Sequence, residues 1–265
     1  MASADFAKRL GRSAFGADAE NYDQARPPYP DRVFEVLRET CGLGPGVRTF
    51  EVGAGTGLAT RELLRAGAAP LVAIEPDARL TAYLRMRSPE PSLQIVNQPF
   101  EAVELSADFD LGTSATAFHW LGQKRALAKV ASALRPGGSW AMWWNVFGDP
   151  DRSDPFHDAT QDLLAGMASH KHDRRYPFAL DSGGRIGDLR RNGSFDANEF
   201  LNLKWTLVLN PAQVRALYAS YSQFSILEAD ERTRLLDSLE DIATTEFGGR
   251  VERNMCTPIY TARRK

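Results

Sequence analysis

A strand-like segment that runs directly into three closely spaced glycines constrains the fold of this chain more than any other feature. Residues 47–52 suit a short buried strand, Gly53, Gly55 and Gly57 follow it, and residues 58–66 suit a helix. Glycines let a ligand lie against bare backbone, and the helix start offers unpaired N–H groups. The segment therefore predicts a site for a nucleotide-like cofactor.

Composition narrows the class of protein. The 265 residues include 32 basic and 34 acidic side chains, and the net charge of −2 leaves no electrostatic footprint for nucleic acid or an anionic membrane surface. No apolar run has the length of a signal-peptide core or a membrane span, and Cys41 and Cys256 match no disulfide or metal spacing. We expect a cytoplasmic globular protein whose partners are neither nucleic acid nor membrane.

Strand-like and helix-like segments alternate along the first half of the chain. The unbroken apolar run at 71–74 is typical of a central parallel strand, and Asp77 is placed to cap the helix after it. Such alternation predicts βαβ units in an open, mostly parallel sheet, which binds ligands at the carboxyl ends of its strands. Further strands are expected at 93–96, from Phe109 towards Trp120 and at 139–146, with helices at 31–39, N-capped by Asp31, and around 127–134.

The second half of the chain is less regular. We expect an insertion on the substrate side at 147–194, with a helix near 159–168, rather than an independent domain. An edge strand at 195–209 and a final strand at 250–262 should lie antiparallel at one edge of the sheet. We expect a single domain, 1–265, with four parts: a lid or arm at 1–30, a cofactor-binding core at 31–146, the insertion at 147–194, and a region at 195–265 that completes the sheet. The last part should contain one helix that begins at Pro211 and another near 229–246.

The N-terminal segment has two interpretations. Tyr22 and Arg26 precede a stiff run of prolines at 27, 28 and 30, which excludes a helix interior. The segment is either an arm on the protein surface with Arg26 in solvent, or a lid that closes over a ligand with Tyr22 and Arg26 facing it.

The spacing of the glycines indicates which cofactor binds. The dinucleotide fingerprint has glycines at positions one, three and six of the turn. Gly53 and Gly55 match, but Leu58 occupies the sixth position and Gly57 falls one residue early. Glu51, two residues before the first glycine, would repel a diphosphate at short range. A cofactor that carries an ammonium or sulfonium charge suits this turn better than NAD or ATP.

Four segments together resemble the class I S-adenosylmethionine-dependent methyltransferases. Residues 51–57 (EVGAGTG) are similar to motif I, and Glu75, Phe109-Asp-Leu and residues 134–138 (LRPGG) match later segments in order and spacing. The run from Tyr22 to Pro30 and the Ala-Phe-His-Trp segment ending at Trp120 are similar to small-molecule enzymes near the trans-aconitate and ubiquinone/menaquinone-biosynthesis groups. The resemblance implies an α/β Rossmann-like fold with a seven-stranded, mostly parallel sheet, helices on both faces and an antiparallel edge strand.

The resemblance also implies methyl transfer from S-adenosylmethionine to a small molecule, with residue roles. Glu51 would order the groups around the charged amino group of the cofactor, and Glu75 would accept from both ribose hydroxyls. The family's usual aspartate for the adenine amino group corresponds to Pro99, so Phe100 either covers the adenine face or belongs to the core. The predicted cofactor site also contains Gly53, Ala54 and Gly55, beneath the methionine part, and Thr56, Gly57 and Pro76.

Catalytic residues are harder to predict. In-line displacement at a sulfonium gains most from alignment of the nucleophile. His119, just past the fourth strand, is the candidate base, or else binds backbone beneath the lid. Trp120 joins Tyr22 and Arg26 as a candidate for the acceptor side. His157, His170 and His172 match no metal motif, so no metal is expected, and Arg174 and Arg175 could bind a substrate carboxylate.

Two other functions stay open on the sequence alone. One is a nicotinamide-dependent oxidoreductase, which Glu51 and Leu58 disfavour. The other is a protein that binds S-adenosylmethionine without turnover. The residues do not indicate whether oxygen, nitrogen or carbon would be methylated, nor the oligomeric state.

Overall fold

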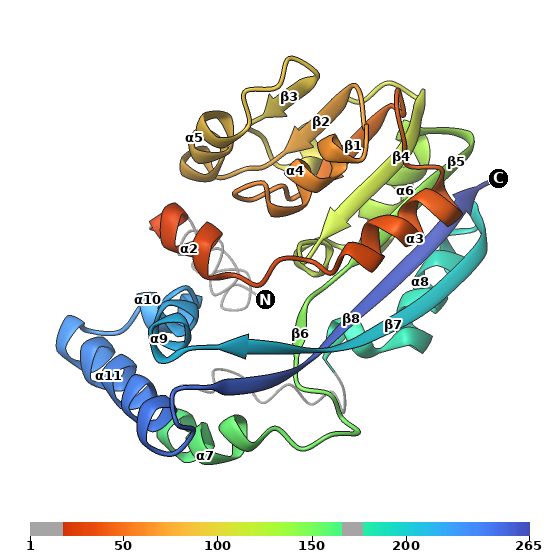
Figure 1. Cartoon of the computed structure of the whole chain (residues 1–265). Coiled ribbons are helices and arrows are strands. Elements are labelled where there is room, and N and C mark those ends of the chain that lie inside the picture. The colour runs from red at the N-terminus through yellow and green to blue at the C-terminus, as the bar shows by residue number, and fades with distance from the viewer. Residues whose placement is uncertain (1–17, 166–176) are drawn as a thin grey trace. The chain divides into compact units, whose positions relative to one another are not determined.

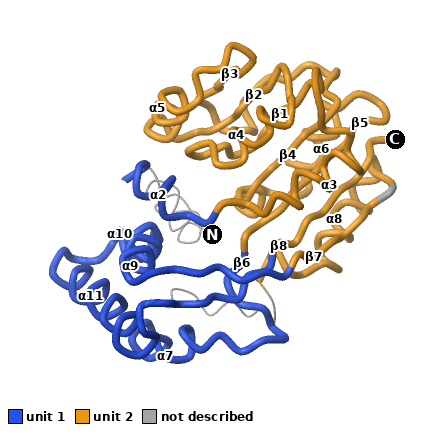
Figure 2. Tube along the Cα trace, in the orientation of Figure 1, with its two compact units in different colours: residues 1–27, 146–175, 204–256 blue, residues 28–145, 176–203, 257–265 orange. Residues whose placement is uncertain are grey.

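The computed structural model of this chain describes residues 18–165 and 177–265. They fall into two compact units (Figure 2), each formed by segments that are far apart in the sequence. Unit 1 comprises residues 1–27, 146–175 and 204–256, and unit 2 comprises residues 28–145, 176–203 and 257–265. The predicted insertion at 147–194 is therefore divided between the units, and the four-part division of the chain stays a proposal.

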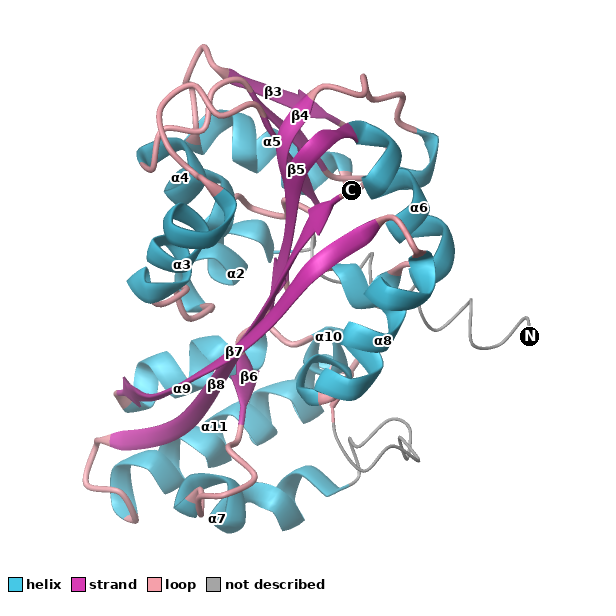
Figure 3. Cartoon of the chain, turned by 90° about the vertical axis from the view of Figure 1, so that its right-hand side faces the viewer, coloured by secondary structure: helices cyan, strands magenta, loops and turns pink. Residues whose placement is uncertain are grey.

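The sheet of unit 2 has the predicted α/β topology (Figure 1). Its strands follow the order β3-β2-β1-β4-β5-β8. The first five are parallel, and β8 is antiparallel to β5. Figure 3 shows α3 and α4 on one face of the sheet and α6 and α8 on the other. The strands are β1 (Thr49–Val52), β2 (Leu71–Ile74), β3 (Leu93–Val96), β4 (Phe109–Ala115), β5 (Leu134–Trp143) and β8 (Val251–Arg264); the helices are α3 (Asp31–Cys41), α4 (Leu58–Arg65), α5 (Ala78–Arg87), α6 (Gln123–Ala133) and α8 (Ser182–Asn192).

The number of strands corrects one expectation. The described residues form an eight-stranded sheet rather than the seven-stranded sheet predicted. The additional strand is β6 (Val146–Phe147), which pairs with β8 and is too short to leave a pattern in the sequence. The predicted edge strand is β7 (Phe195–Leu209), which also pairs with β8 and runs in the opposite direction to it in Figure 1.

Burial explains why the strands of unit 2 form where they do. All four residues of β1 and all four of β2 are buried, as expected for central strands that are covered on both faces. One face of α3 contributes Val33, Phe34 and Leu37 to a core that also contains Leu63 of α4. These contacts pack α4, which begins directly after the glycine turn, against α3.

Two predicted helix starts have different outcomes. Asp77 caps α5 as predicted, because its side chain accepts from the Arg79 N–H. Asp31 is not a cap: Pro30 is the N-cap of α3, no side chain caps the helix, and Asp31 is its first residue. A carboxylate in the first turn still favours the positive end of the helix dipole.

Strand β5 begins earlier and ends earlier than predicted. Phe109 of β4 pairs with Leu134, whereas Leu111, two residues on, pairs with Ser139. The Arg-Pro-Gly-Gly segment therefore bulges out of the ladder inside β5, instead of only ending the helix before it. A Cβ on Gly138 would lie 3.0 Å from the Phe109 carbonyl oxygen, so a side chain there would disturb the pairing.

Unit 1 has its own core. Phe156, Leu217 and Leu239 are fully buried in it. The Arg253 guanidinium donates to both carboxylate oxygens of Asp154, at 3.1 and 2.9 Å, and to the Tyr218 hydroxyl. The helices of unit 1 are α2 (Ala19–Ala25), α7 (Pro155–Leu164), α9 (Pro211–Ala219), α10 (Ser222–Ser225) and α11 (Ala229–Thr245), so α9 and α11 match the predicted helices and α7 begins before the predicted 159–168.

Candidate active site

The three glycines of the turn differ in what surrounds them. All have positive φ, at +75° for Gly53, +58° for Gly55 and +94° for Gly57, a conformation that favours glycine. A Cβ on Gly53 would lie 2.3 Å from the Ala117 Cβ, and one on Gly57 would lie 2.3 Å from the Leu84 Cδ1. No heavy atom lies within 4 Å of a Cβ built on Gly55. Packing requires Gly53 and Gly57, whereas Gly55 borders open space that a ligand can occupy.

Glu75 ties the end of β2 to this turn. Its carboxylate accepts from the Gly55 N–H and the Asp77 N–H, each at 2.9 Å. The Asn97 amide donates to the carbonyl oxygens of Glu75 and Pro76, at 3.0 Å each. These backbone N–H groups hold the Glu75 carboxylate in place beside the turn. The role of Glu75 toward a ribose stays a prediction.

Glu51 is a fully buried acid. It is 1% exposed, and its Oε2 accepts from the Thr60 hydroxyl of α4 at 2.6 Å. Burial, with a smaller contribution from the Glu75 charge, raises the pKa of Glu51 to about 8, although the Thr60 hydrogen bond and the Arg61 charge oppose the shift. A buried carboxyl in this state gains from a nearby cation. The site therefore suits a positively charged cofactor.

The remaining residues of the turn are also enclosed. Ala54 is buried, and its N–H donates to the Ile74 carbonyl oxygen at 3.1 Å. Thr56 is 1% exposed, and its hydroxyl has no hydrogen-bond partner, which is unusual for a buried polar group. Unit 2 thus brings together the predicted residues from Glu51 to Gly57 with Glu75 and Pro76.

Phe100 has the contacts of a core residue. Its ring is 3% exposed and stacks on Phe50, with centroids 6.4 Å apart and planes 9° apart. Phe50 in turn packs against Phe109 and Trp140. The core interpretation accounts for these contacts, and a contact between Phe100 and adenine stays a prediction.

His119 lies in a short 3₁₀ helix, η3 (Phe118–Trp120), that follows β4. The Trp144 indole donates from Nε1 to the His119 Nδ1 at 3.1 Å. The His119 ring also lies 4.9 Å from the Trp120 ring and 6.1 Å from the Phe178 ring, between centroids. Ala117 directly precedes this helix, and its Cβ would lie 2.3 Å from a Cβ built on Gly53. The candidate catalytic residue is therefore adjacent to the cofactor turn through the backbone of the β4 loop.

Sequence reasoning missed the partner of His119. Trp144 was not predicted as a site residue, because nothing in the sequence pairs an indole N–H with a histidine 25 positions earlier. It also missed Thr116, which has a positive φ of 52° and whose hydroxyl lies 2.9 Å from the Tyr29 hydroxyl. Positive φ is rare for a β-branched residue and marks the β4 loop as a constrained segment.

Tyr22 and Arg26 belong to unit 1. The Arg26 guanidinium lies over the Tyr22 ring and the Tyr221 ring, 4.9 and 4.5 Å from their centroids, and donates to the Ser220 carbonyl oxygen. Arg26 is therefore packed on aromatic rings of its own unit. This packing disagrees with the predicted alternative in which Arg26 of a surface arm lies in solvent. The lid stays a proposal.

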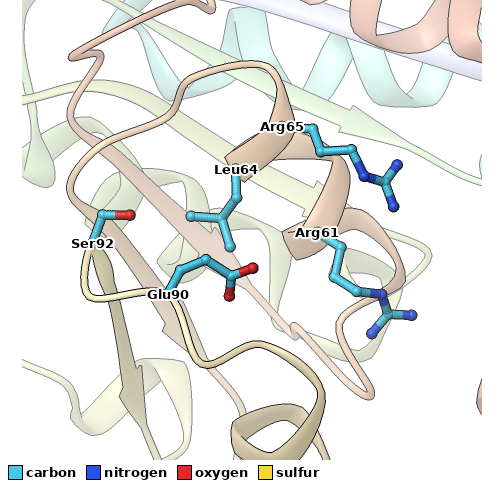
Figure 4. A pocket seen from close by; sticks show the side chains of 5 residues that line it. All are labelled: Arg61, Leu64, Arg65, Glu90 and Ser92. Atoms are coloured by element: carbon cyan, nitrogen blue, oxygen red, sulfur yellow. The ribbon is translucent and has the colours of Figure 1, made fainter.

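The remaining candidate sites, for a metal ion and for a substrate carboxylate, have no support among the described residues. No group of three or more metal-ligating side chains exists within residues 18–165 and 177–265; His170, His172, Arg174 and Arg175 lie outside those ranges. A pocket of about 290 Å³ is lined by Arg61, Leu64 and Arg65 of α4 with Glu90 and Ser92 (Figure 4), none of which was predicted as a site residue. Across the described helices, none is both long and apolar enough to cross a membrane.

Comparison with known proteins identifies a methyltransferase domain in this chain. Residues 50–142 match the family model described as a methyltransferase domain. A Schizosaccharomyces pombe protein, named as an uncharacterized methyltransferase, is 22% identical over 263 residues, which cover 96% of this chain and 97% of that protein.

Solved structures share the fold. A protein of Anaeromyxobacter dehalogenans, provisionally called a type II methyltransferase, has a TM-score of 0.61 at 21% identity, over 90% of this chain and 97% of that one. Phosphoethanolamine N-methyltransferase 2 of Haemonchus contortus, solved with S-adenosylhomocysteine, has a TM-score of 0.58 at 12% identity over 94% of this chain. This chain spans only 57% of the Haemonchus protein.

The fold, the acidic glycine turn and the matched domain define a class I methyltransferase. The chain is an S-adenosylmethionine-dependent enzyme of that class, and it transfers the methyl group of this cofactor to an acceptor. Its residues fit the cofactor: Glu51 offers a buried carboxyl to a cation, the Glu75 carboxylate lies beside the turn, and open space borders Gly55. This result favours methyl transfer over the nicotinamide alternative.

Proposed function

We propose that the acceptor is a small molecule, bound in unit 2 where β4 and β5 end. The observation that carries this proposal is the cluster of rings around His119. Trp120, Trp144 and Phe178 surround the imidazole, and the cluster adjoins the glycine turn through the β4 loop. In open α/β sheets, ligands bind at this edge. Aromatic walls with a few polar groups suit small molecules.

The residues of the turn hold the donor in this proposal. Bound S-adenosylmethionine supplies an electrophilic sulfonium methyl group. Glu75 binds the ribose hydroxyls while its backbone partners, the Gly55 and Asp77 N–H groups, keep the carboxylate oriented. Glu51 stabilises the cationic end of the cofactor. Gly53, Ala54, Gly55, Thr56, Gly57 and Pro76 form the surrounding wall.

Two further parts of the proposal concern the acceptor side. Trp120 lines the acceptor, and the lid at 1–30 and 147–194, with Tyr22 and Arg26, stays a prediction from the sequence.

The location and partners complete the proposal. We place the enzyme in the cytoplasm, acting on neither nucleic acid nor membrane lipid. Both cysteines are free and buried, as a reducing compartment allows, and the net charge of −2 favours no polyanion. Fractionation of cells that produce the full chain would contradict this placement if the protein sedimented with membranes.

The acceptor class can be tested with S-adenosylmethionine labelled on the methyl group. The full chain is incubated with a panel of small acids, phenols and amines, and in parallel with total protein and total RNA. We expect label in small-molecule products and release of S-adenosylhomocysteine. A Glu75→Ala variant, confirmed as folded by circular dichroism, should give far less of both at the same cofactor concentration. Label found only in protein or RNA would overturn the proposal of a small acceptor.

A further inference from the structure

We infer that Trp144 fixes His119 as a hydrogen-bond donor, and that the enzyme therefore methylates an acceptor oxygen that is already anionic at neutral pH. The inference rests on the proposed site at the ends of β4 and β5, and it replaces the general-base role that the sequence suggested for His119. Trp144 is then a positioning residue and His119 the group that contacts the acceptor.

The tautomer follows from the hydrogen bond between the two side chains. An indole N–H can only donate. The Trp144 Nε1 lies 3.1 Å from the His119 Nδ1, so Nδ1 must present its lone pair. A neutral imidazole with a lone pair on Nδ1 carries its proton on Nε2. The remaining ring nitrogen can thus donate a hydrogen bond and has no lone pair with which to take a proton.

Packing holds the indole in this orientation. Trp144 is 3% exposed. Its ring packs edge-on against Phe178 at 5.7 Å and against Tyr260 at 6.1 Å, between centroids. The Tyr260 hydroxyl donates to the Ala179 carbonyl oxygen at 2.7 Å, and the Arg185 guanidinium lies 3.5 Å over the Phe178 ring. Both neighbours of the indole are anchored in turn.

A base role would have to undo this arrangement. If His119 took up a second proton, both ring nitrogens would be donors, and Nδ1–H would face the indole N–H. If it changed tautomer to expose a lone pair at Nε2, the same clash of donors would arise. Each change leaves a buried indole N–H without an acceptor, which proteins avoid.

The class of acceptor follows from what a donor can do. An anionic oxygen attacks the methyl carbon with its own lone pair, the carbon–sulfur bond breaks, and its electron pair stays on sulfur as a neutral thioether. The methylated oxygen becomes a neutral ester or ether, so no proton has to be removed. The His119 Nε2–H can hold the acceptor by a hydrogen bond to an oxygen, which is stronger when that oxygen is charged.

Matched substitutions of His119 separate the two roles. Glutamine keeps an N–H donor but cannot act as a base near neutral pH. With an acidic acceptor found in the labelled panel, we expect His119→Gln to keep kcat/KM within about fivefold, and His119→Phe to lose about 100-fold. The pH profile of kcat/KM for His119→Gln should overlay that of the wild-type enzyme. If His119→Gln is as inactive as His119→Phe while both are folded, the donor role is wrong.

Substitution of Trp144 tests its role as a positioning residue. Trp144→Phe keeps an aromatic ring and removes the N–H. We expect it to lower kcat about tenfold in the wild-type background and by less than twofold in the His119→Gln background, because glutamine has no tautomer to fix. Equal losses in the two backgrounds would show a merely structural effect and would contradict the inference.

A readout that needs no acceptor keeps this inference separate from the proposed function. In protein labelled with ¹⁵N histidine, NMR should show His119 with a proton on Nε2 and none on Nδ1, and this pattern should be lost in Trp144→Phe. A proton on Nδ1 in the wild-type protein would overturn the tautomer even if no small molecule were methylated. A correct tautomer with label only in macromolecules would instead contradict the proposed function alone.

Discussion

The two ends of the proposed site in unit 2 are built in different ways. The donor end, at β1 and β2, uses backbone N–H groups, glycines and two carboxylates. Every residue of it lies between Glu51 and Asn97. The acceptor end, beyond β4 and β5, uses side chains that come together from His119, Trp144, Phe178 and Tyr260.

This difference shows where each kind of specificity comes from. The donor is one compound, and a fixed backbone conformation at a short motif can recognise it. The acceptor end is assembled through tertiary packing of segments far apart in the chain, so its shape changes with the loops while the sheet stays the same. Substitutions that affect one end and spare the other test this division.

The largest effect is expected from Gly53→Ala. The new Cβ would lie 2.3 Å from the Ala117 Cβ, in backbone with a φ of +75°. We expect a loss of about 3 kcal/mol in the free energy of unfolding and loss of cofactor binding, measured by denaturation and calorimetry. Gly46→Ala is the matched control, because Gly46 has a φ of +78° with no atom within 4 Å of the added Cβ. It should cost only about 1 kcal/mol and leave binding intact. Equal costs would show that contact with the β4 loop does not matter.

Glu75→Ala should come next. It removes the carboxylate that we propose accepts from both ribose hydroxyls, and two hydrogen bonds to a charged group contribute about 3 kcal/mol. We expect S-adenosylmethionine to bind about 100-fold more weakly in calorimetric titration. Asp77→Asn, which keeps a capping side chain for α5, serves as the control and should change the affinity by less than threefold. Undiminished binding by Glu75→Ala would remove Glu75 from the donor end.

Glu51→Gln should change how binding depends on pH. The Glu51 pKa is about 8, so this carboxyl is mostly protonated at pH 6. A cationic ligand binds better to the ionised carboxylate, and at lower pH its binding must also displace the proton, which weakens the affinity. The affinity of the wild-type protein for S-adenosylmethionine should rise at least about tenfold between pH 6 and 8, whereas Glu51→Gln should show a weaker dependence. 5′-Methylthioadenosine, which lacks the charged end, should bind with no such dependence. A pH-independent affinity in the wild-type protein would contradict the role of Glu51.

The same pKa has a consequence for the stability of the protein without ligand. The Glu51 pKa is raised from 4.5 in the unfolded chain to about 8 in the folded protein. Its contribution to stability is therefore fully present below pH 4.5 and is lost as the pH rises through 8. Between pH 6 and 9 the melting temperature of Glu51→Gln should fall by a few degrees less than that of the wild-type protein.

The smallest effect on binding is expected from Phe100→Leu. The Phe100 ring packs on Phe50 in the core, so the substitution should cost about 1–2 kcal/mol of stability and leave the affinity for S-adenosylhomocysteine within twofold. A tenfold loss of affinity in the folded variant would instead show that Phe100 contributes to adenine binding, so that the donor end includes residues outside the glycine turn.

The donor end could be predicted from the sequence because its conformation is dictated locally. Three glycines and an acid at fixed spacing set the turn, and Glu75 follows at the end of the next strand. The topology followed from the same regularity: β2 and β3 have the predicted bounds, and the last strand pairs antiparallel with β5. The matched methyltransferase domain, residues 50–142, covers this region.

The acceptor end could not be predicted because its contacts join residues with no common pattern. Trp144 and His119 meet only once β5 is in register beside β4. The bulge at the Arg-Pro-Gly-Gly segment shifted β5 from its predicted bounds, and the two-residue β6 was invisible to any periodicity. Arg26 is a similar case, since its stacking on Tyr221 depends on the fold of unit 1.

The position of β8 has a consequence for synthesis of the protein. β8 pairs with β5, β6 and β7, and Trp143 of β5 has Ile259 as its partner. The ribosome makes β5 long before β8, so the growing chain carries an unpaired strand edge flanked by Trp140, Met142 and Trp143, all of which end up fully buried. Residues 251–264 must therefore be synthesised before this edge is covered, and a nascent chain of this protein should depend on chaperones that shield apolar strands until then.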